Sequence, residues 1–387
     1  MSGIIGKIKE NDNAALFLKI CFVWVCSIIA MMLIGIVYCI VTGTEKGFIE
    51  LMQIWDAKRY NYIVENGYTY PQDHDPQANW AFFPLYVLVC MAIKAITFGI
   101  VDTYLIGMVV SSLCIITAAF FAYKIIGDEK RGMRVVIIML AGPYSFYYAS
   151  MMTEAMFVMF TVLFFYCCRQ KKFLLAGLMS ALASATRIVG VLLVFSLLVE
   201  LYMEISAGYK PWAGIKNFVI TMLKTPKHIF SVLLCPFGAF CYMTFLYFFC
   251  GDPWAFKNVQ IAWRSNEHIP VIGVLWEACT GQMNRNYFTF MGWMCLVFIG
   301  VYIYMFVKKH YSMATFGMLT LLVALSSHVM STIRFTVGTF VIYVGAHEIM
   351  KVIENDSALT KWTVRVLAVA FTIIMLVFWY NQSGWVM

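Results

Sequence analysis

Long apolar runs separated by short polar segments make up most of this sequence. A helix that crosses a membrane needs roughly 20 predominantly apolar residues. The runs predict eleven spanning helices, at about 18–42, 104–126, 134–149, 153–168, 173–186, 188–204, 229–250, 287–307, 311–329, 335–350 and 362–380. Because no soluble domain fits between the runs, residues 1–387 are expected to form one all-α integral membrane unit.

Two parts of the pattern are unusual. The adjoining runs at 173–186 and 188–204 predict a tight helical hairpin that turns near Arg187. The run at 84–98 is short and contains Lys94, so it is either a short span or an interfacial or re-entrant helix. The second interpretation gives the better charge pattern, and we adopt it.

Composition and charge agree with a membrane protein. The chain is 62% hydrophobic and 12% charged, with a mean hydropathy of +0.80, whereas soluble domains are about one quarter charged. The 28 Lys and Arg exceed the 20 Asp and Glu, which is typical both of nucleic-acid binding and of basic loops that orient membrane helices. With 84–98 outside the bilayer, 19 of the 28 basic residues lie on one side.

This bias favours basic loops facing the cytoplasm, with membrane lipids and not nucleic acid as partners. The N-terminus is then cytoplasmic, in a multi-pass protein of the cell membrane. Two sizeable loops, at about 43–103 and 251–286, are external. The longest cytoplasmic loop, about 205–228, has the pattern of a basic amphipathic helix on the inner leaflet.

Several charged residues are predicted to share the external face. Such groups are costly near a bilayer and usually need partners or a wet cavity. They are Asp56, Lys58, Arg59, Glu65, Glu154, Arg187, Asp252, Arg264, Glu267 and Arg334, with Lys94 as a further candidate for phosphate binding. A positioned Asp accepts a proton from an attacking hydroxyl, and Arg stabilises a departing phosphate. The aromatic side chains of Trp55, Tyr60 and Trp80 offer apolar faces for sugar rings. This combination suits the transfer of a sugar from a lipid phosphate.

Three of these residues also have a purely structural interpretation. Asp56 can cap a short amphipathic helix, and Glu154 can favour the N-terminus of its span through the helix dipole. Arg187 follows a run of small residues suited to close helix packing, and it can extend to the membrane surface as an interfacial arginine.

The sequence Asp73-His74-Asp75 resembles a metal cluster, but adjacent residues do not easily converge on one ion. No metal and no cofactor is expected.

Five motifs occur in an order that resembles a known family. They are W-D-A-K-R-Y-N-Y-I-V-E-N-G-Y, A-F-F-P-L-Y, P-Y-S-F-Y-Y-A-S-M-M-T-E-A-M-F, A-G-L-M-S-A-L-A-S-A-T-R-I-V-G and G-D-P-W-A-F-K-N-V-Q-I-A-W. Together they look like the PIG-V-type membrane mannosyltransferases, named for the enzyme that adds the second mannose to GPI anchors. The similarity covers most of residues 50–265 and resumes weakly at S-T-I-R-F. The chain is short for a eukaryotic member and is more similar to compact bacterial relatives, which build no GPI anchor.

The resemblance implies a GT-C glycosyltransferase with juxtamembrane helices in its first external loop. Such an enzyme takes a hexose, mannose in the family, from a polyprenyl-phosphate-linked sugar donor and inverts the anomeric centre. It maps the catalytic base onto Asp56.

In this hypothesis Glu154 orients the acceptor or Asp56, while Arg187, Arg334 and Lys94 bind the donor phosphate. The acceptor is an extracytoplasmic glycolipid or glycan, and neither it nor the sugar is fixed by the sequence. The alternatives are a transporter or flippase for a polar lipid or glycolipid, and a scaffold without catalysis.

Overall fold

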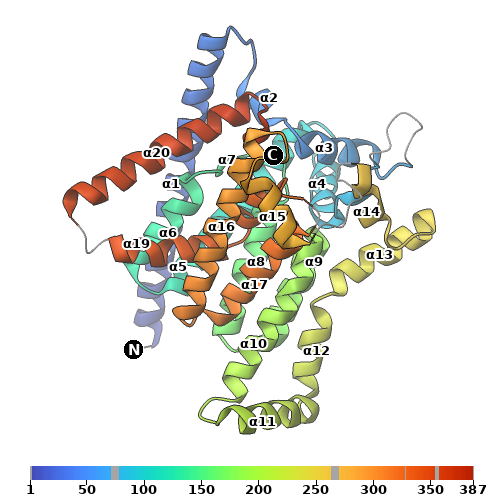
Figure 1. Cartoon of the computed structure of the whole chain (residues 1–387), viewed down its shortest axis with the longest axis vertical. Helices are drawn as coiled ribbons and strands as arrows, with labels where there is room; N and C mark the ends of the chain where they lie inside the picture. The colour runs from blue at the N-terminus through green and yellow to red at the C-terminus, as the bar shows by residue number, and fades with distance from the viewer. Residues whose placement is uncertain (1, 71–77, 263–269, 327, 354–356, 387) are drawn as a thin grey trace.

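The computed structural model consists of helices and connecting loops (Figure 1), and it describes residues 2–70, 78–262, 270–326, 328–353 and 357–386. The helices are α1 (Ser2–Thr42), α2 (Phe48–Met52), α3 (Asp56–Asn66), α4 (Pro84–Ile96), α5 (Thr103–Ile126), α6 (Glu129–Ala141), α7 (Phe146–Ala149), α8 (Glu154–Arg169), α9 (Phe173–Thr186), α10 (Leu193–Ile205), α11 (Pro211–Lys224), α12 (Pro226–Leu234), α13 (Phe237–Cys250), α14 (Ala255–Asn258), α15 (Val271–Cys279), α16 (Asn286–Val307), α17 (Tyr311–Leu325), α18 (Thr332–Val337), α19 (Val341–Ile353) and α20 (Ala358–Tyr380). Short 3₁₀ turns are η1 (Asn79–Ala81), η2 (Ile188–Leu192), η3 (Val259–Ala262) and η4 (Gly384–Val386).

The all-α expectation is confirmed for the described residues, but eleven spans are not. Within the described ranges, five helices are long and apolar enough to cross a membrane, and α12 with α13 makes a sixth if that pair, bent by 51°, counts as one span. The five begin at Asp12, Thr103, Ile188, Asn286 and Ala358. The protein is therefore compatible with a multi-pass membrane protein of fewer full-length spans than the hydrophobic runs suggest.

Two of the expected spans are interrupted. The run at 134–149 breaks between α6 and α7, where Gly142-Pro143 follows the helix; proline lacks the backbone N–H that would continue it. The run at 335–350 breaks between α18 and α19. There the hydroxyl groups of Thr336 and Thr339 donate to backbone carbonyls three or four residues earlier, a local alternative to helix continuation. Hydropathy alone does not register either break.

The hairpin predicted near Arg187 is confirmed, and small residues let two further helices pack closely on its first arm. α9 ends at Thr186, and the chain returns through η2 into α10. A Cβ atom on Gly238 would lie 2.0 Å from the carbonyl oxygen of Ala181, and one on Gly177 would lie 2.3 Å from that of Ser231. The backbones of α12 and α13 thus contact α9 directly, a spacing that only glycine permits.

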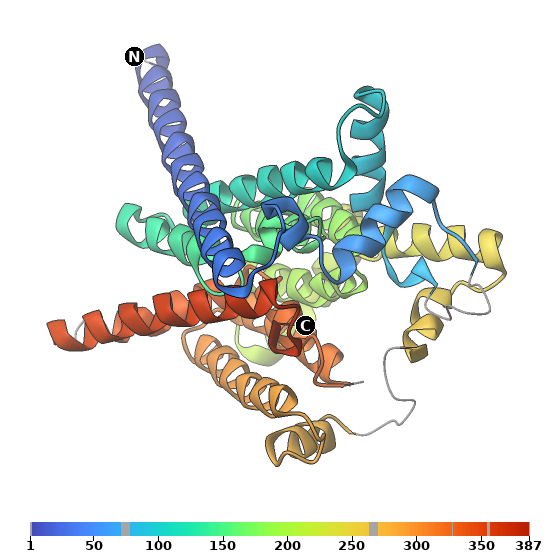
Figure 2. The same ribbon diagram turned by 90° about the horizontal axis from the view of Figure 1, so that it is seen from above.

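The remaining helices differ in how closely they pack around α9. α8 packs between α5 and α9, whereas α1 and α20 extend away from the bundle and from each other (Figures 1 and 2). These two helices meet near Tyr380, whose hydroxyl donates to the carbonyl oxygen of Met31 at 2.7 Å. The run at 84–98 forms the short helix α4, which packs against α3, α5 and α9. The broken helices α7 and α18 and the turn at Arg187 adjoin the cavity described next.

Candidate functional site

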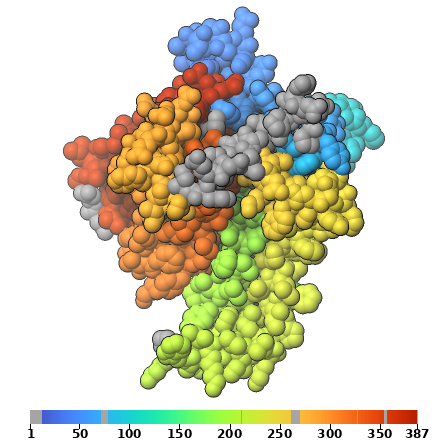
Figure 3. Space-filling view, turned by 45° about the vertical axis from the view of Figure 1, so that its right-hand side comes forward, coloured from blue at the N-terminus to red at the C-terminus, as the bar shows by residue number. Residues whose placement is uncertain are grey.

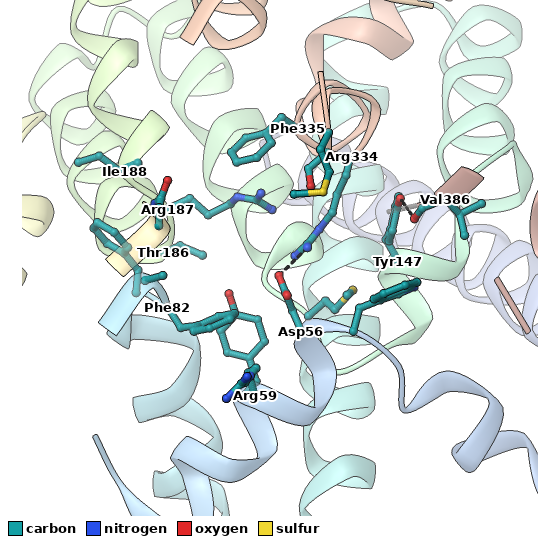
Figure 4. A pocket seen from close by; sticks show the side chains of 18 residues that line it. Asp56, Arg59, Phe82, Tyr147, Thr186, Arg187, Ile188, Arg334, Phe335 and Val386 are labelled. Carbon is teal, nitrogen blue, oxygen red and sulfur yellow. Dashed lines mark hydrogen bonds and ion pairs between the residues drawn. The ribbon is translucent and has the colours of Figure 1, made fainter. Parts of the chain in front are cut away.

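Four charged side chains from distant parts of the sequence form one connected cluster. Figure 4 shows three of them, Asp56, Arg187 and Arg334, at the cavity wall. Nη1 of Arg334 donates to Oδ2 of Asp56 at 2.5 Å, and Nε of the same guanidinium donates to Oε1 of Glu154. Nη1 of Arg187 donates to that same Oε1 at 2.6 Å. Two carboxylates and two guanidinium groups therefore balance one another, with Arg334 joining the two acids.

The cluster borders a cavity of about 630 Å³. Its wall is mostly aromatic and apolar, with a small number of charged and polar groups. The lining residues are Trp55, Asp56, Arg59, Tyr60, Ala81, Phe82, Phe83, Tyr147, Met152, Thr186, Arg187, Ile188, Gln260, Met330, Ser331, Arg334, Phe335 and Val386. A volume of this size is within the usual range of ligand sites, about 300–1,000 Å³.

The two acids occupy different positions relative to the cavity. The Asp56 side chain lines it and is 31% exposed. The Glu154 side chain is 0% exposed and is not a lining residue. Its Oε2 is buried with no hydrogen-bond partner among the described residues. Glu154 therefore fixes the positions of the arginines, while Asp56 is the acid that a ligand can reach.

Local backbone geometry places the arginines. Arg187 follows the last residue of α9 with extended backbone angles, φ −153° and ψ 139°, which turn its side chain toward the centre of the cavity (Figure 4). Its guanidinium lies 4.5 Å from the ring centroid of Phe335, a favourable cation–π distance. Arg334 lies on the short α18, which begins after Ser331, a residue with a left-handed φ of 66°.

The first loop supplies the facing wall. Trp55 has a φ of 50°, which is rare for an aromatic residue and signals backbone strain directly before Asp56. Tyr60 is one turn further along α3, and its hydroxyl lies 3.2 Å from Oγ1 of Thr153, the residue before Glu154. Burial, together with the negative charge of Asp56, raises the pKa of Tyr60 well above its ordinary value. Tyr60 thus stays a neutral phenol that ties α3 to the start of α8.

Two of the expected site residues lie elsewhere. Lys94 donates to Oε2 of Glu65, and Thr103 donates to Oε1 of the same carboxylate. Trp80 is buried in a second hydrophobic cluster with Tyr242, and its indole N–H donates to the carbonyl oxygen of Thr69 at 2.9 Å. Neither side chain lines the cavity. Trp80 affects the cavity only indirectly. The three residues that follow it in the sequence, Ala81, Phe82 and Phe83, line the cavity wall.

Arg59, expected among the charged residues of the external face, does line the cavity. It lies three residues after Asp56 on α3, so helix geometry places both on one face. Other lining residues were not foreseen as site residues. Tyr147 and Val386 meet where the Tyr147 hydroxyl donates to the Val386 carbonyl at 2.8 Å. They are 239 positions apart, and no local pattern predicts that contact.

Metal ligation has no support in the described part of the chain, where no group of three or more His, Cys, Asp or Glu side chains is arranged to hold an ion. Asp73-His74-Asp75 lies outside the described residues, as do Arg264 and Glu267. No family model matches this sequence, and no curated protein matches it significantly. The resemblance to PIG-V-type enzymes therefore stays a prediction from the order of the motifs.

Proposed function

We propose that this protein is an inverting GT-C-type glycosyltransferase. It would move a hexose, mannose by family resemblance, from a polyprenyl-phosphate donor to a hydroxyl group of a glycolipid or glycan outside the cytoplasm. The observation that carries the proposal is the cluster in which Arg334 joins Asp56 to Glu154 beside Arg187, at the wall of a cavity large enough for a sugar.

The arginines provide a site for the donor phosphate. Their guanidinium groups are permanently charged and are held together by one buried carboxylate oxygen. Fixed cations of this kind stabilise the charge that develops on a departing phosphate, and they need little rearrangement as the bond breaks. Arg59 adds a further positive charge to the cavity lining. Three arginines and a single acid, Asp56, are thus among the lining residues, a composition that suits an anionic ligand.

Asp56 provides the base. The oxygen of the acceptor hydroxyl attacks the anomeric carbon and forms a new C–O bond, while the bond from that carbon to the phosphate oxygen breaks. The hydroxyl proton passes to the Asp56 carboxylate, and the bond electrons leave with the phosphate. Arg334 bonds one oxygen of Asp56, Oδ2, and thereby holds the carboxylate in place to accept this proton.

The aromatic wall fits the remaining requirement. Trp55, Tyr60 and Phe82 line the cavity on the Asp56 side, and aromatic faces suit the apolar faces of sugar rings. Tyr60 and Phe82 pack edge to face with ring centroids 5.1 Å apart, which fixes their orientation. In this proposal Glu154 and Trp80 position other residues and do not contact substrate.

The direct test is an Asp56→Asn variant of the full chain, purified into lipid nanodiscs and incubated with radiolabelled polyprenyl-phosphate mannose and a panel of alkyl glycosides. Loss of a general base lowers the rate by about 100- to 10,000-fold, and donor binding should persist. Asp252→Asn is the matched control, because Asp252 lies in a turn where it accepts from the backbone N–H of Trp254 and does not line the cavity.

Undiminished transfer by Asp56→Asn would exclude the catalytic assignment. Lipid movement across the bilayer without any sugar product, in the wild-type protein, would favour a transporter instead. Mass spectrometry of glycolipids and glycans from cells that lack the protein would then identify the substrates, since the loss of one hexose from one species names both sugar and acceptor.

A further inference from the structure

A second charged surface lies at the end of the molecule away from the cavity. Helix α11 connects α10 to α12 and crosses their ends (Figure 1). Together these segments form a projection below the rest of the protein (Figure 3). Nδ2 of Asn217 donates to the carbonyl oxygen of Ile205 at 2.9 Å, and the hydroxyl of Ser206 donates to that of Gly214 at 2.9 Å. The helix is therefore fixed on α10 and is not a loose loop.

The two sides of α11 differ in what they contact. Gly214 is buried and Phe218 packs edge to face on Tyr202, with ring centroids 5.7 Å apart. The opposite stripe, spaced by three and four residues, is apolar and exposed, and it consists of Trp212, Ile215, Val219 and Leu223. Trp212 is 86% exposed and Leu223 is 71% exposed. In a helix of 3.6 residues per turn these positions form one continuous face.

The charge around this stripe has a single sign. Exposed lysines occupy positions 210, 216, 224 and 227. The sequence contains no acidic residue between Glu204 and Asp252, and Glu204 itself pairs with Lys171 at 2.6 Å. An apolar stripe beside lysines matches the boundary between acyl chains and anionic headgroups. A second copy of the chain docked there would bring lysines against lysines, so charge disfavours self-association through this face.

We propose that α11, with Lys210, Lys216, Lys224 and Lys227, is a docking surface for anionic phospholipid headgroups. The stripe enters the acyl region and the lysines bind the phosphates. This surface is connected to the cavity through two helices. α10 leads back through η2 to Arg187, and α12 packs against α9, which ends beside Arg187. Anionic lipid would therefore hold both arms of the Arg187 hairpin at their far ends.

The test uses the purified full chain and no catalytic readout, so it is independent of the glycosyltransferase proposal. Retained phosphatidylglycerol is counted by native mass spectrometry, and thermal unfolding is compared in nanodiscs of phosphatidylcholine alone and of phosphatidylcholine with phosphatidylglycerol. We expect phosphatidylglycerol to raise the unfolding midpoint of the wild-type protein. The double variant Lys216→Gln/Lys224→Gln should bind phosphatidylglycerol about 25-fold more weakly, from about fivefold per lysine.

The matched control is Lys46→Gln/Lys58→Gln, which removes the same charge from exposed positions outside α11 and should leave lipid retention unchanged. Trp212→Ser should weaken retention while the lysines remain, since it removes the largest apolar anchor. Equal retention by both lysine variants would overturn the proposal. Cross-linking of two chains through position 212 in the same nanodiscs would also overturn it, in favour of a dimer interface.

Discussion

Two sets of ion-paired side chains involve the first loop, and they differ in burial, which hydropathy and charge along the sequence do not reveal. One is the cluster of Asp56, Arg334, Glu154 and Arg187; the other is the pair of Lys94 with Glu65. The Glu154 side chain is fully buried and the Arg334 side chain 11% exposed, whereas Lys94 and Glu65 are 26% and 38% exposed. In the first group two arginines, each with a side chain only 11% exposed, share one buried carboxylate oxygen. The second is a solvent-screened pair that joins α3 to α4.

The comparison shows that a charged residue near a membrane site need not belong to it. All five residues proposed as catalytic or phosphate-binding carry charges close to apolar runs, yet Lys94 finds its partner outside the cavity. A buried charge without its partner is strongly destabilising, while an exposed pair contributes little. The predictions below use this contrast, in order of decreasing expected effect.

The largest effect is expected from Glu154→Gln. Removing the shared carboxylate leaves two nearly buried guanidinium groups with one remaining acid, and such losses cost about 3–5 kcal/mol of folding free energy. Chemical unfolding in mixed micelles measures this difference. Glu65→Gln is the matched change at the exposed pair and should cost less than about 1 kcal/mol. Equal losses in both variants would erase the distinction between the two groups.

Exchanging the cations should affect activity next most strongly. Arg334→Lys keeps the charge but cannot reach both Asp56 and Glu154 with one planar fork, so kcat/KM for sugar transfer should fall about 100-fold, as when one transition-state donor is lost. Lys94→Arg, the reverse exchange, should leave kcat/KM within about twofold of the wild type, because exposed pairs tolerate such changes. A larger loss from Lys94→Arg would place Lys94 in the donor site after all.

Trp80→Phe should have a smaller effect, on stability more than on substrate binding. The substitution removes the bond from the indole N–H to the partly buried Thr69 carbonyl, so the cost should lie at the lower end of the about 1–3 kcal/mol of a fully buried unpaired acceptor. Because Trp80 does not line the cavity, KM for the sugar acceptor should change little. Trp55→Phe is the comparison, since Trp55 does line it. A rise in KM from Trp80→Phe without loss of stability would return Trp80 to the sugar site.

The smallest expected effect is the loss of folding stability at low pH that comes from Glu65. Hydrogen bonds from Lys94 and then Thr103 hold the pKa of Glu65 below its ordinary value of 4.5. The folded protein therefore binds this proton less readily than the unfolded chain, and the stabilisation is present above the ordinary pKa and is lost as the pH falls through the lowered one. The loss should stay below about 1 kcal/mol because the pair is exposed. It should vanish in Glu65→Gln, which a pH series of unfolding midpoints can measure.

Much of the fold could be predicted from local patterns. Runs of apolar residues are long enough to identify helices such as α5, α16 and α20, and the small residues of α9 predicted the close packing that Gly177 and Gly238 complete. The turn at Arg187 was predicted for a different reason, since a single helix there would have placed a guanidinium in mid-membrane. The breaks after α6 and α18 were missed, because hydropathy averages over a Gly-Pro pair or threonine hydroxyls.

The candidate site was predictable in its members more than in its geometry. Asp56, Glu154, Arg187 and Arg334 all belong to one cluster. Glu154 was expected to orient the acceptor or Asp56, but it contacts the two arginines and is closed off from the cavity. Arg59, one turn from Asp56, was already among the charged residues expected on the external face, whereas no local pattern pointed to Val386.

The sequence by itself determined that this chain is helical, with several helices long and apolar enough to cross a membrane, because the length and polarity of each segment set whether it forms an apolar helix. It also singled out the acidic and basic residues that are costly to bury. Only the tertiary structure decided their pairing. Arg334 reaches Glu154 across 180 positions and Asp56 across 278, and such contacts depend on how whole helices pack, which no periodicity in a single segment encodes.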